Sequence, residues 1–70
     1  MRKIAVVADS LALTRMKKGF SLRKLAEAAN VDYSTINKLE NGKQKTTPET
    51  AKKLCSALGV SFEEVFIVES

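Results

Sequence analysis

Residues 21–40 read SLRKLAEAANVDYSTINKLE and contain two short amphipathic segments separated by a turn. Ser21 and Asp32 are residues that commonly cap the start of a helix, and each stands at the head of one segment. Asn30 suits the turn because asparagine accepts positive φ more readily than most residues, and Val31 adds an apolar plug. Apolar residues recur at helical spacing in both segments: Leu22, Leu25, Ala26, Ala29, Ile36 and Leu39.

A helix-turn-helix consists of two short helices joined by a tight turn, and its second helix enters the major groove of DNA. The sequence predicts such a unit over 21–40, with the second helix over 32–40. Ala26 is small, as a close crossing of the two helices requires. Recognition of the major groove is therefore the first functional hypothesis.

Three further helices are expected outside this unit. The first lies within Ala5–Lys18, is capped by Asp9 or Ser10 and ends at Gly19, which suits a left-handed backbone. The residues expected on its buried side are Leu11, Met16 and Ala12.

The other two helices follow a polar, basic loop at Lys43–Thr46. Residues 47–49, TPE, combine a capping hydroxyl, proline in the first helical position and an acid in the first turn, and Gly59 ends that helix. Residues 61–64, SFEE, form a capping box that opens a short fifth helix. The residues expected to face inward are Ala51, Leu54, Cys55, Leu58, Phe62, Val65 and Phe66.

The two ends of the chain leave alternatives open. Lys3–Val7 and Val65–Glu69 are rich in β-branched residues. Either they pair as a small two-stranded ribbon, within one chain or between two, or the N-terminus is frayed and the C-terminus is an extended tail. The expected fold class is all-α with five helices, and a terminal β-ribbon is one alternative for the ends.

Length and composition restrict the function. A chain of 70 residues makes one domain, 1–70, with a small core. With one cysteine, Cys55, and no histidine, the chain lacks an internal disulfide and the usual zinc ligand sets, so neither a metal nor another cofactor is expected. No nucleophile and base stand at catalytic spacing, which argues against an enzyme. The apolar runs Ile4–Ala8 and Val65–Val68 are too short to cross a bilayer, so the default compartment is the cytoplasm.

The positive charge is concentrated in one part of the chain. The net charge is +4, and the segment from Arg15 to Lys45 holds eight basic residues against three acidic ones, an excess of five. The rest of the chain is therefore slightly acidic. Such a concentration favours a surface that faces a polyanion.

The sequence resembles the Cro/C1-type helix-turn-helix family, the lambdoid phage repressor-like or XRE family. The residues that carry the resemblance are Arg15, Gly19-Phe20-Ser21, Leu25-Ala26-Glu27, Val31, Ser34-Thr35-Ile36, Leu39-Glu40-Asn41-Gly42-Lys43, Pro48 and Leu58-Gly59-Val60-Ser61. The resemblance implies a lambda-repressor-like domain of five packed helices. It also implies specific binding to double-stranded DNA, usually as a homodimer on a two-fold-related operator.

The resemblance also assigns roles to residues. Base contacts are expected from the groove-facing side of the recognition helix: Tyr33, Ser34, Asn37, Lys38 and Asp32. Lysine donates to guanine and asparagine pairs with adenine, whereas Asp32 is either a base contact or only the helix cap. Phosphate contacts are expected from Arg23, Lys24, Thr35, Asn41, Lys43 and Lys45. Arg15 and Glu40 are expected to form a structural ion pair, as the corresponding positions do in similar proteins.

The sequence departs from the family pattern at several positions. Leu22 stands where many relatives carry glutamine, and it loses that residue's polar contact. Asn30 replaces the usual glycine, and Tyr33 and Ser34 replace commoner glutamine or arginine. These changes alter which operator is expected and leave the binding mode as it is.

Two classes of function remain after this comparison. The first is a DNA-binding transcriptional regulator, with repression expected because so short a chain leaves no room for an effector domain. The second is an antitoxin or another helix-turn-helix module that acts mainly through a regulatory protein partner, for which the apolar tail Val65–Val68 would be the contact.

Overall fold

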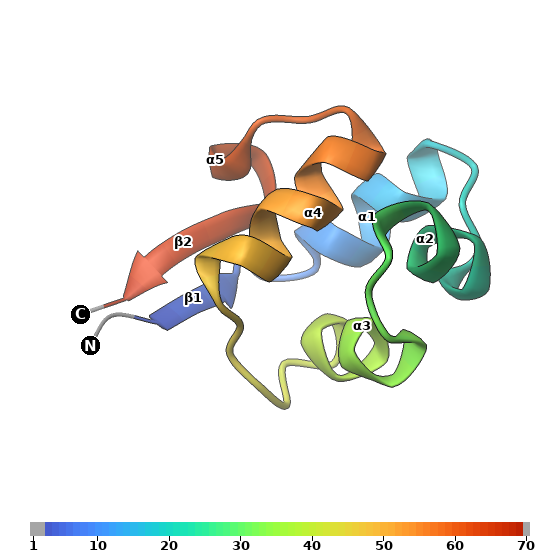
Figure 1. Cartoon of the computed structure of the whole chain (residues 1–70). Coiled ribbons are helices and arrows are strands. Elements are labelled where there is room, and N and C mark those ends of the chain that lie inside the picture. The colour runs from blue at the N-terminus through green and yellow to red at the C-terminus, as the bar shows by residue number, and fades with distance from the viewer. Residues whose placement is uncertain (1–2, 70) are drawn as a thin grey trace.

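The computed structural model describes residues 3–69, which form five helices and a two-stranded antiparallel sheet (Figure 1). In chain order the elements are β1 Lys3–Val6, α1 Ser10–Lys17, α2 Leu22–Ala29, α3 Tyr33–Glu40, α4 Pro48–Leu58, α5 Phe62–Val65 and β2 Phe66–Glu69. The expected lambda-repressor-like arrangement of five helices is confirmed, and the small ribbon is present as well. Between residues 3 and 69, no helix has the length and apolar character needed to span a bilayer.

The two ends of the described chain pair with each other. β1 and β2 run antiparallel, in a register that places Lys3 opposite Glu69 and Val6 opposite Phe66. On the outer side of β1, Ile4 exchanges backbone hydrogen bonds with Thr46 at 3.2 and 2.8 Å. The ribbon within one chain is therefore the correct alternative, and the frayed N-terminus with an extended tail is wrong. Figure 1 shows the ribbon at one end of the molecule, beside both termini.

The core lies between the helices and receives residues from every one of them. The largest fully buried side chains are Leu11, Leu25, Ile36, Leu39, Leu54 and Val65. Loss of such a leucine or isoleucine to alanine typically costs about 2–5 kcal/mol of stability. In so small a domain this cluster fixes how α2 and α3 cross.

The helix ends form mostly as their capping residues predict. The Ser21 hydroxyl accepts a hydrogen bond from the Lys24 amide at the start of α2. Asn30 ends that helix with φ at 56°, in the left-handed region. Thr47 caps α4 in the same way as Ser21 caps α2. The predicted capping box between Ser61 and Glu64 is present at α5. The order of helix and turn therefore follows from local chemistry.

Met16 is the clear exception to the predicted core. It was expected on the buried side of α1, but its side chain is 57% exposed. A helix turns about 100° per residue, so Met16 lies about 140° round the axis from buried Leu11. Arg15 is only about 40° from Leu11 and occupies the inward side instead. Ala12 is half-buried.

Candidate nucleic-acid interface

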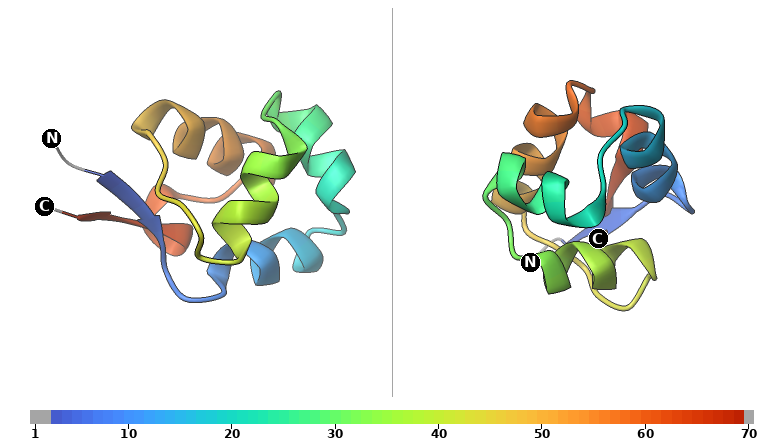
Figure 2. Two further views of the ribbon diagram at one scale, coloured as in Figure 1. Left: turned by 90° about the horizontal axis from the view of Figure 1, so that it is seen from below. Right: turned by 90° about the vertical axis from the view of Figure 1, so that its right-hand side faces the viewer.

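α3 lies on the surface with one apolar and one polar side. Ile36 and Leu39 are fully buried and hold the helix against the core. The left view of Figure 2, seen from below, looks directly onto α3 and the following loop, with no other element in front of them. The residues on the outer side are all exposed: Tyr33, Ser34, Asn37, Lys38 and Asn41. Their spacing of one and four residues places them on a single face of the helix.

The turn before α3 sets the position of this face. The Val31 amide donates to the Ala26 carbonyl at 3.1 Å, so the chain folds back tightly after α2. The Asp32 carbonyl accepts from the amides of Thr35 and Ile36, which makes Asp32 the residue that begins the helix. α3 therefore starts directly at the crossing with α2.

Asp32 was expected to cap α3 with its side chain, but its carboxylate forms no capping hydrogen bond with the first turn of the helix. It accepts a hydrogen bond from the Ser34 hydroxyl instead. This bond lowers the pKa of Asp32 below its ordinary value, so the group is ionised at neutral pH. The Ser34 proton is then committed to Asp32, and what this pair offers a ligand is mainly hydrogen-bond acceptors.

Asn37 and Asn41 are linked along the same face. The Asn41 side-chain amide donates to the Asn37 carbonyl at 2.8 Å and to the Asn37 Oδ1 at 3.1 Å. The Asn37 Oδ1 is therefore already an acceptor within the protein, whereas its NH₂ group is free of partners among the described residues. Lys38 forms no ion pair between residues 3 and 69, and its ammonium group is exposed.

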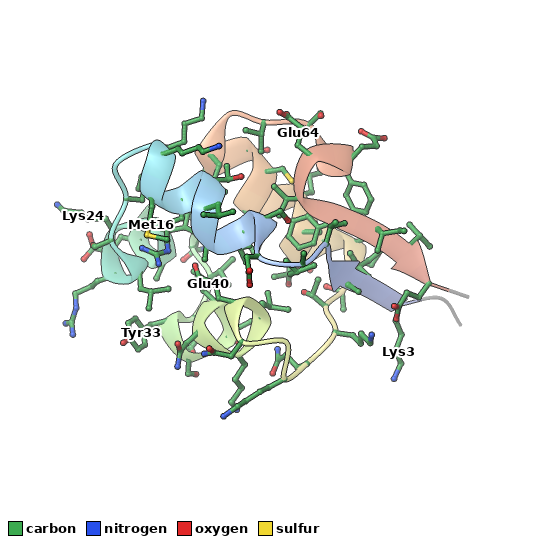
Figure 3. All side chains as sticks on the ribbon, turned by 180° about the vertical axis from the view of Figure 1, so that it is seen from behind. Lys3, Met16, Lys24, Tyr33, Glu40 and Glu64 are labelled. Carbon is green, nitrogen blue, oxygen red and sulfur yellow. The ribbon has the colours of Figure 1, made fainter. Side chains whose placement is uncertain are left out.

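Basic side chains come from the two elements that flank α3. Arg23 and Lys24 stand in the first turn of α2, and Lys43 and Lys45 in the loop after α3, all exposed. In Figure 3, Lys24 and Tyr33 lie toward the end of the molecule opposite Lys3. Two further residues are expected to contact phosphate. Asn41 is exposed, whereas Thr35 is half-buried and therefore less accessible.

Two contacts of these residues were not expected from the sequence. The Lys45 Nζ lies 2.6 Å from Oε1 of Glu69 on β2, and both side chains are about half exposed. The Arg23 Cζ lies 6.0 Å from the centre of the Tyr33 ring. Each contact joins residues from separate elements, and no local sequence signal indicates either one.

Arg15 and Glu40 meet between α1 and the end of α3. The Arg15 Nε lies 2.6 Å from Glu40 Oε2, and Nη2 donates to Oε1 at 3.1 Å. The remaining nitrogen, Nη1, donates to the Phe20 carbonyl at 2.9 Å. The side chains of Arg15 and Glu40 are only 14% and 9% exposed. Figure 3 shows Glu40 in the space between the two helices.

Comparison with known proteins places this architecture in a family. The family model HTH_3, described as helix-turn-helix, matches residues 11–65. The transcriptional regulator ClgR from Mycobacterium tuberculosis is 31% identical over 62 residues, which are 89% of this chain and 55% of that protein. The chain therefore spans about half the length of the curated relatives that it matches.

Solved structures of regulators have the same fold. SinR, a master regulator for biofilm formation solved in complex with DNA, aligns with a TM-score of 0.79 and 29% identity, over 83% of this chain and 97% of that one. The restriction-modification controller protein C.AhdI from Aeromonas hydrophila aligns with 0.77 and 28%, over 81% and 86%. The clp gene regulator ClgR from Corynebacterium glutamicum aligns with 0.75 and 35%, over 81% and 61%.

Proposed function

The chain belongs to the HTH_3 family of helix-turn-helix proteins, and on this premise we propose that it is a transcriptional repressor that reads double-stranded DNA sequence-specifically. Residues 32–40 would enter the major groove. One observation carries the proposal: α3 buries Ile36 and Leu39 and turns an unbroken polar face outward.

Each exposed residue of that face has a role in the proposal. Lys38 donates to guanine, Asn37 presents its free NH₂ group to a base, and the Tyr33 ring contacts a thymine methyl. Ser34 and Asp32 together offer acceptors, which suits the amino group of cytosine. The groups assigned to phosphate are Arg23, Lys24, Thr35, Asn41, Lys43 and Lys45.

Assembly and location complete the proposal. One recognition helix reads too few base pairs for tight specific binding, so two copies of the chain are proposed to bind two related half-sites. The protein would act in the cytoplasm as a single domain, 1–70. Arg15 and Glu40 would serve the fold and make no contact with DNA.

Selection of bound sequences from a random duplex pool tests specific readout. We expect a motif with two related halves, and affinity that falls by roughly three decades or more between low and physiological salt. Lys38→Ala should change the preferred base at one position in each half. Lys53→Ala is the matched control, because Lys53 is an exposed lysine on α4, and this variant should select the unchanged motif. A pool that yields no motif would refute the proposal.

One observation favours a second candidate, a module that acts through a protein partner. Ile67 and Val68 on β2 are 53% and 46% exposed. β2 is an edge strand of the two-stranded sheet, and an exposed apolar edge strand is a template for pairing with another chain. A partner strand could pair with this edge. Under this alternative, the protein would show no salt-dependent shift of a random duplex, and Val68→Lys would abolish the partner complex.

A further inference from the structure

Arg23 and Tyr33 lie at the beginnings of α2 and α3, the two helices of the helix-turn-helix. Arg23 is the second residue of α2 and Tyr33 is the first residue of α3. The guanidinium carbon lies 6.0 Å from the ring centre, at the outer limit of a cation–π contact. Both side chains are exposed, with Tyr33 at 47%. The ring therefore gives the arginine a preferred position beside the recognition helix.

The guanidinium of Arg23 has no other partner in the described part of the chain. It forms neither a salt bridge nor a side-chain hydrogen bond there. Arg15 differs, because each of its three nitrogens donates to an oxygen of the protein. A ring contact occupies only the flat face of a guanidinium. The N–H groups along the edge of Arg23 are thus free to donate to a ligand.

Leu22, the residue before Arg23, cannot make a polar contact with a ligand. Leu22, the first residue of α2, is half-buried and packs against the hydrophobic core. It presents no polar group to a ligand. Arg23 is consequently the first residue of α2 with an exposed polar side chain that a ligand of α3 could meet.

We propose that Arg23 is a specificity-determining residue that reads a guanine beside the bases read by α3. This inference rests on the proposed function and goes beyond the phosphate contact assigned to Arg23. An arginine donates two hydrogen bonds to guanine O6 and N7, and this pairing needs a planar group held in a defined orientation. Tyr33 is the positioning residue that holds it, through its ring and not through its hydroxyl.

Repeating the duplex selection with variants tests the inference. Arg23→Lys keeps the charge and loses the planar fork, so preference for guanine at one position in each half-site should fall by about 5- to 150-fold. Tyr33→Leu should weaken the guanine preference at that same position, whereas Tyr33→Phe should retain it. Lys24→Ala is the matched control, because Lys24 is the next residue and is equally basic and exposed. It should weaken binding to all sequences alike.

The outcomes separate this inference from the proposed function. If the unaltered protein selects a motif and Arg23→Lys selects the same motif with uniformly lower affinity, Arg23 contacts only phosphate and the inference is wrong. Retention of the full guanine preference by Tyr33→Leu would overturn the positioning role. If the unaltered protein selects no motif at all, the proposed function itself fails. Circular dichroism of each variant verifies that the fold is unchanged.

Discussion

Arg15 and Arg23 are the same kind of residue in opposite settings. Arg15 is mostly buried, and its guanidinium donates to Glu40 and to the Phe20 carbonyl. Arg23 is exposed, and among residues 3–69 its guanidinium interacts with the face of the Tyr33 ring alone. The difference shows that burial and bonding partners determine which donors one kind of side chain has left for a ligand. An arginine whose three nitrogens all donate within the protein joins helices, whereas one with free donors remains available to a ligand.

The largest expected effect comes from breaking the buried pair. Glu40→Ala leaves the Arg15 guanidinium mostly buried without its carboxylate, and we expect a loss of about 3 kcal/mol of stability. Urea denaturation followed by circular dichroism measures it. Arg23→Ala is the matched control and should change stability by less than about 0.5 kcal/mol. Equal losses in the two variants would contradict the contrast between the two arginines.

Exchange of arginine for lysine should distinguish the two sites next. Arg15→Lys keeps the charge but loses the fork that reaches Glu40 and Phe20 together, so a loss of about 1–2 kcal/mol is expected from the missing hydrogen bonds. The same exchange at Arg23 should leave stability unchanged. Thermal denaturation of both variants provides the measurement, and an unchanged melting temperature for Arg15→Lys would show that charge alone suffices.

Lys45 is intermediate between Arg15 and Arg23, because it has an ion-pair partner, Glu69, that is itself half exposed. Under the proposed function, Glu69 would compete with phosphate for the Lys45 ammonium group, because the two side chains form an ion pair. An exposed ion pair contributes about 0.2–1 kcal/mol, so Glu69→Gln should raise affinity for DNA by about 1.4- to 5-fold. In a plot of log affinity against log salt concentration, the slope should steepen by up to about one. In a Lys45→Gln background the same substitution should have a much smaller effect, and titrations at several salt concentrations test both expectations.

The smallest effect concerns the hydrogen bond between Ser34 and Asp32. This bond lowers the pKa of Asp32 from its ordinary value of 3.8, so the stability it adds is present above that value. As pH falls through the lowered pKa, Asp32 is protonated and this contribution is lost. The difference in melting temperature between the native protein and Ser34→Ala should therefore shrink below pH 3.8. A difference that stays constant down to pH 2 would show that the ionised form is not favoured.

Much of the fold could be predicted because its signals are local. α3 spans Tyr33–Glu40, directly after the expected helix-starting residue Asp32, and Asn30 has the left-handed backbone expected of it. Caps and turns depend on residues within four positions of one another. The prediction for Met16 was wrong because Arg15, and not Met16, lies on the side of α1 that carries buried Leu11. In so short a helix, one misplaced residue changes which side chain meets the core.

The amino-acid sequence by itself determined the helices, their order, the turn at Asn30 and the polar outer face of α3, since backbone preferences and helical periodicity act over a few residues. Only the tertiary structure decided that β1 pairs with β2 in one chain, that Glu69 reaches Lys45 and that Arg23 lies over Tyr33. Those contacts join residues from different elements. They depend on the angles at which helices and strands pack around the shared core, and no pattern along the chain encodes such angles directly.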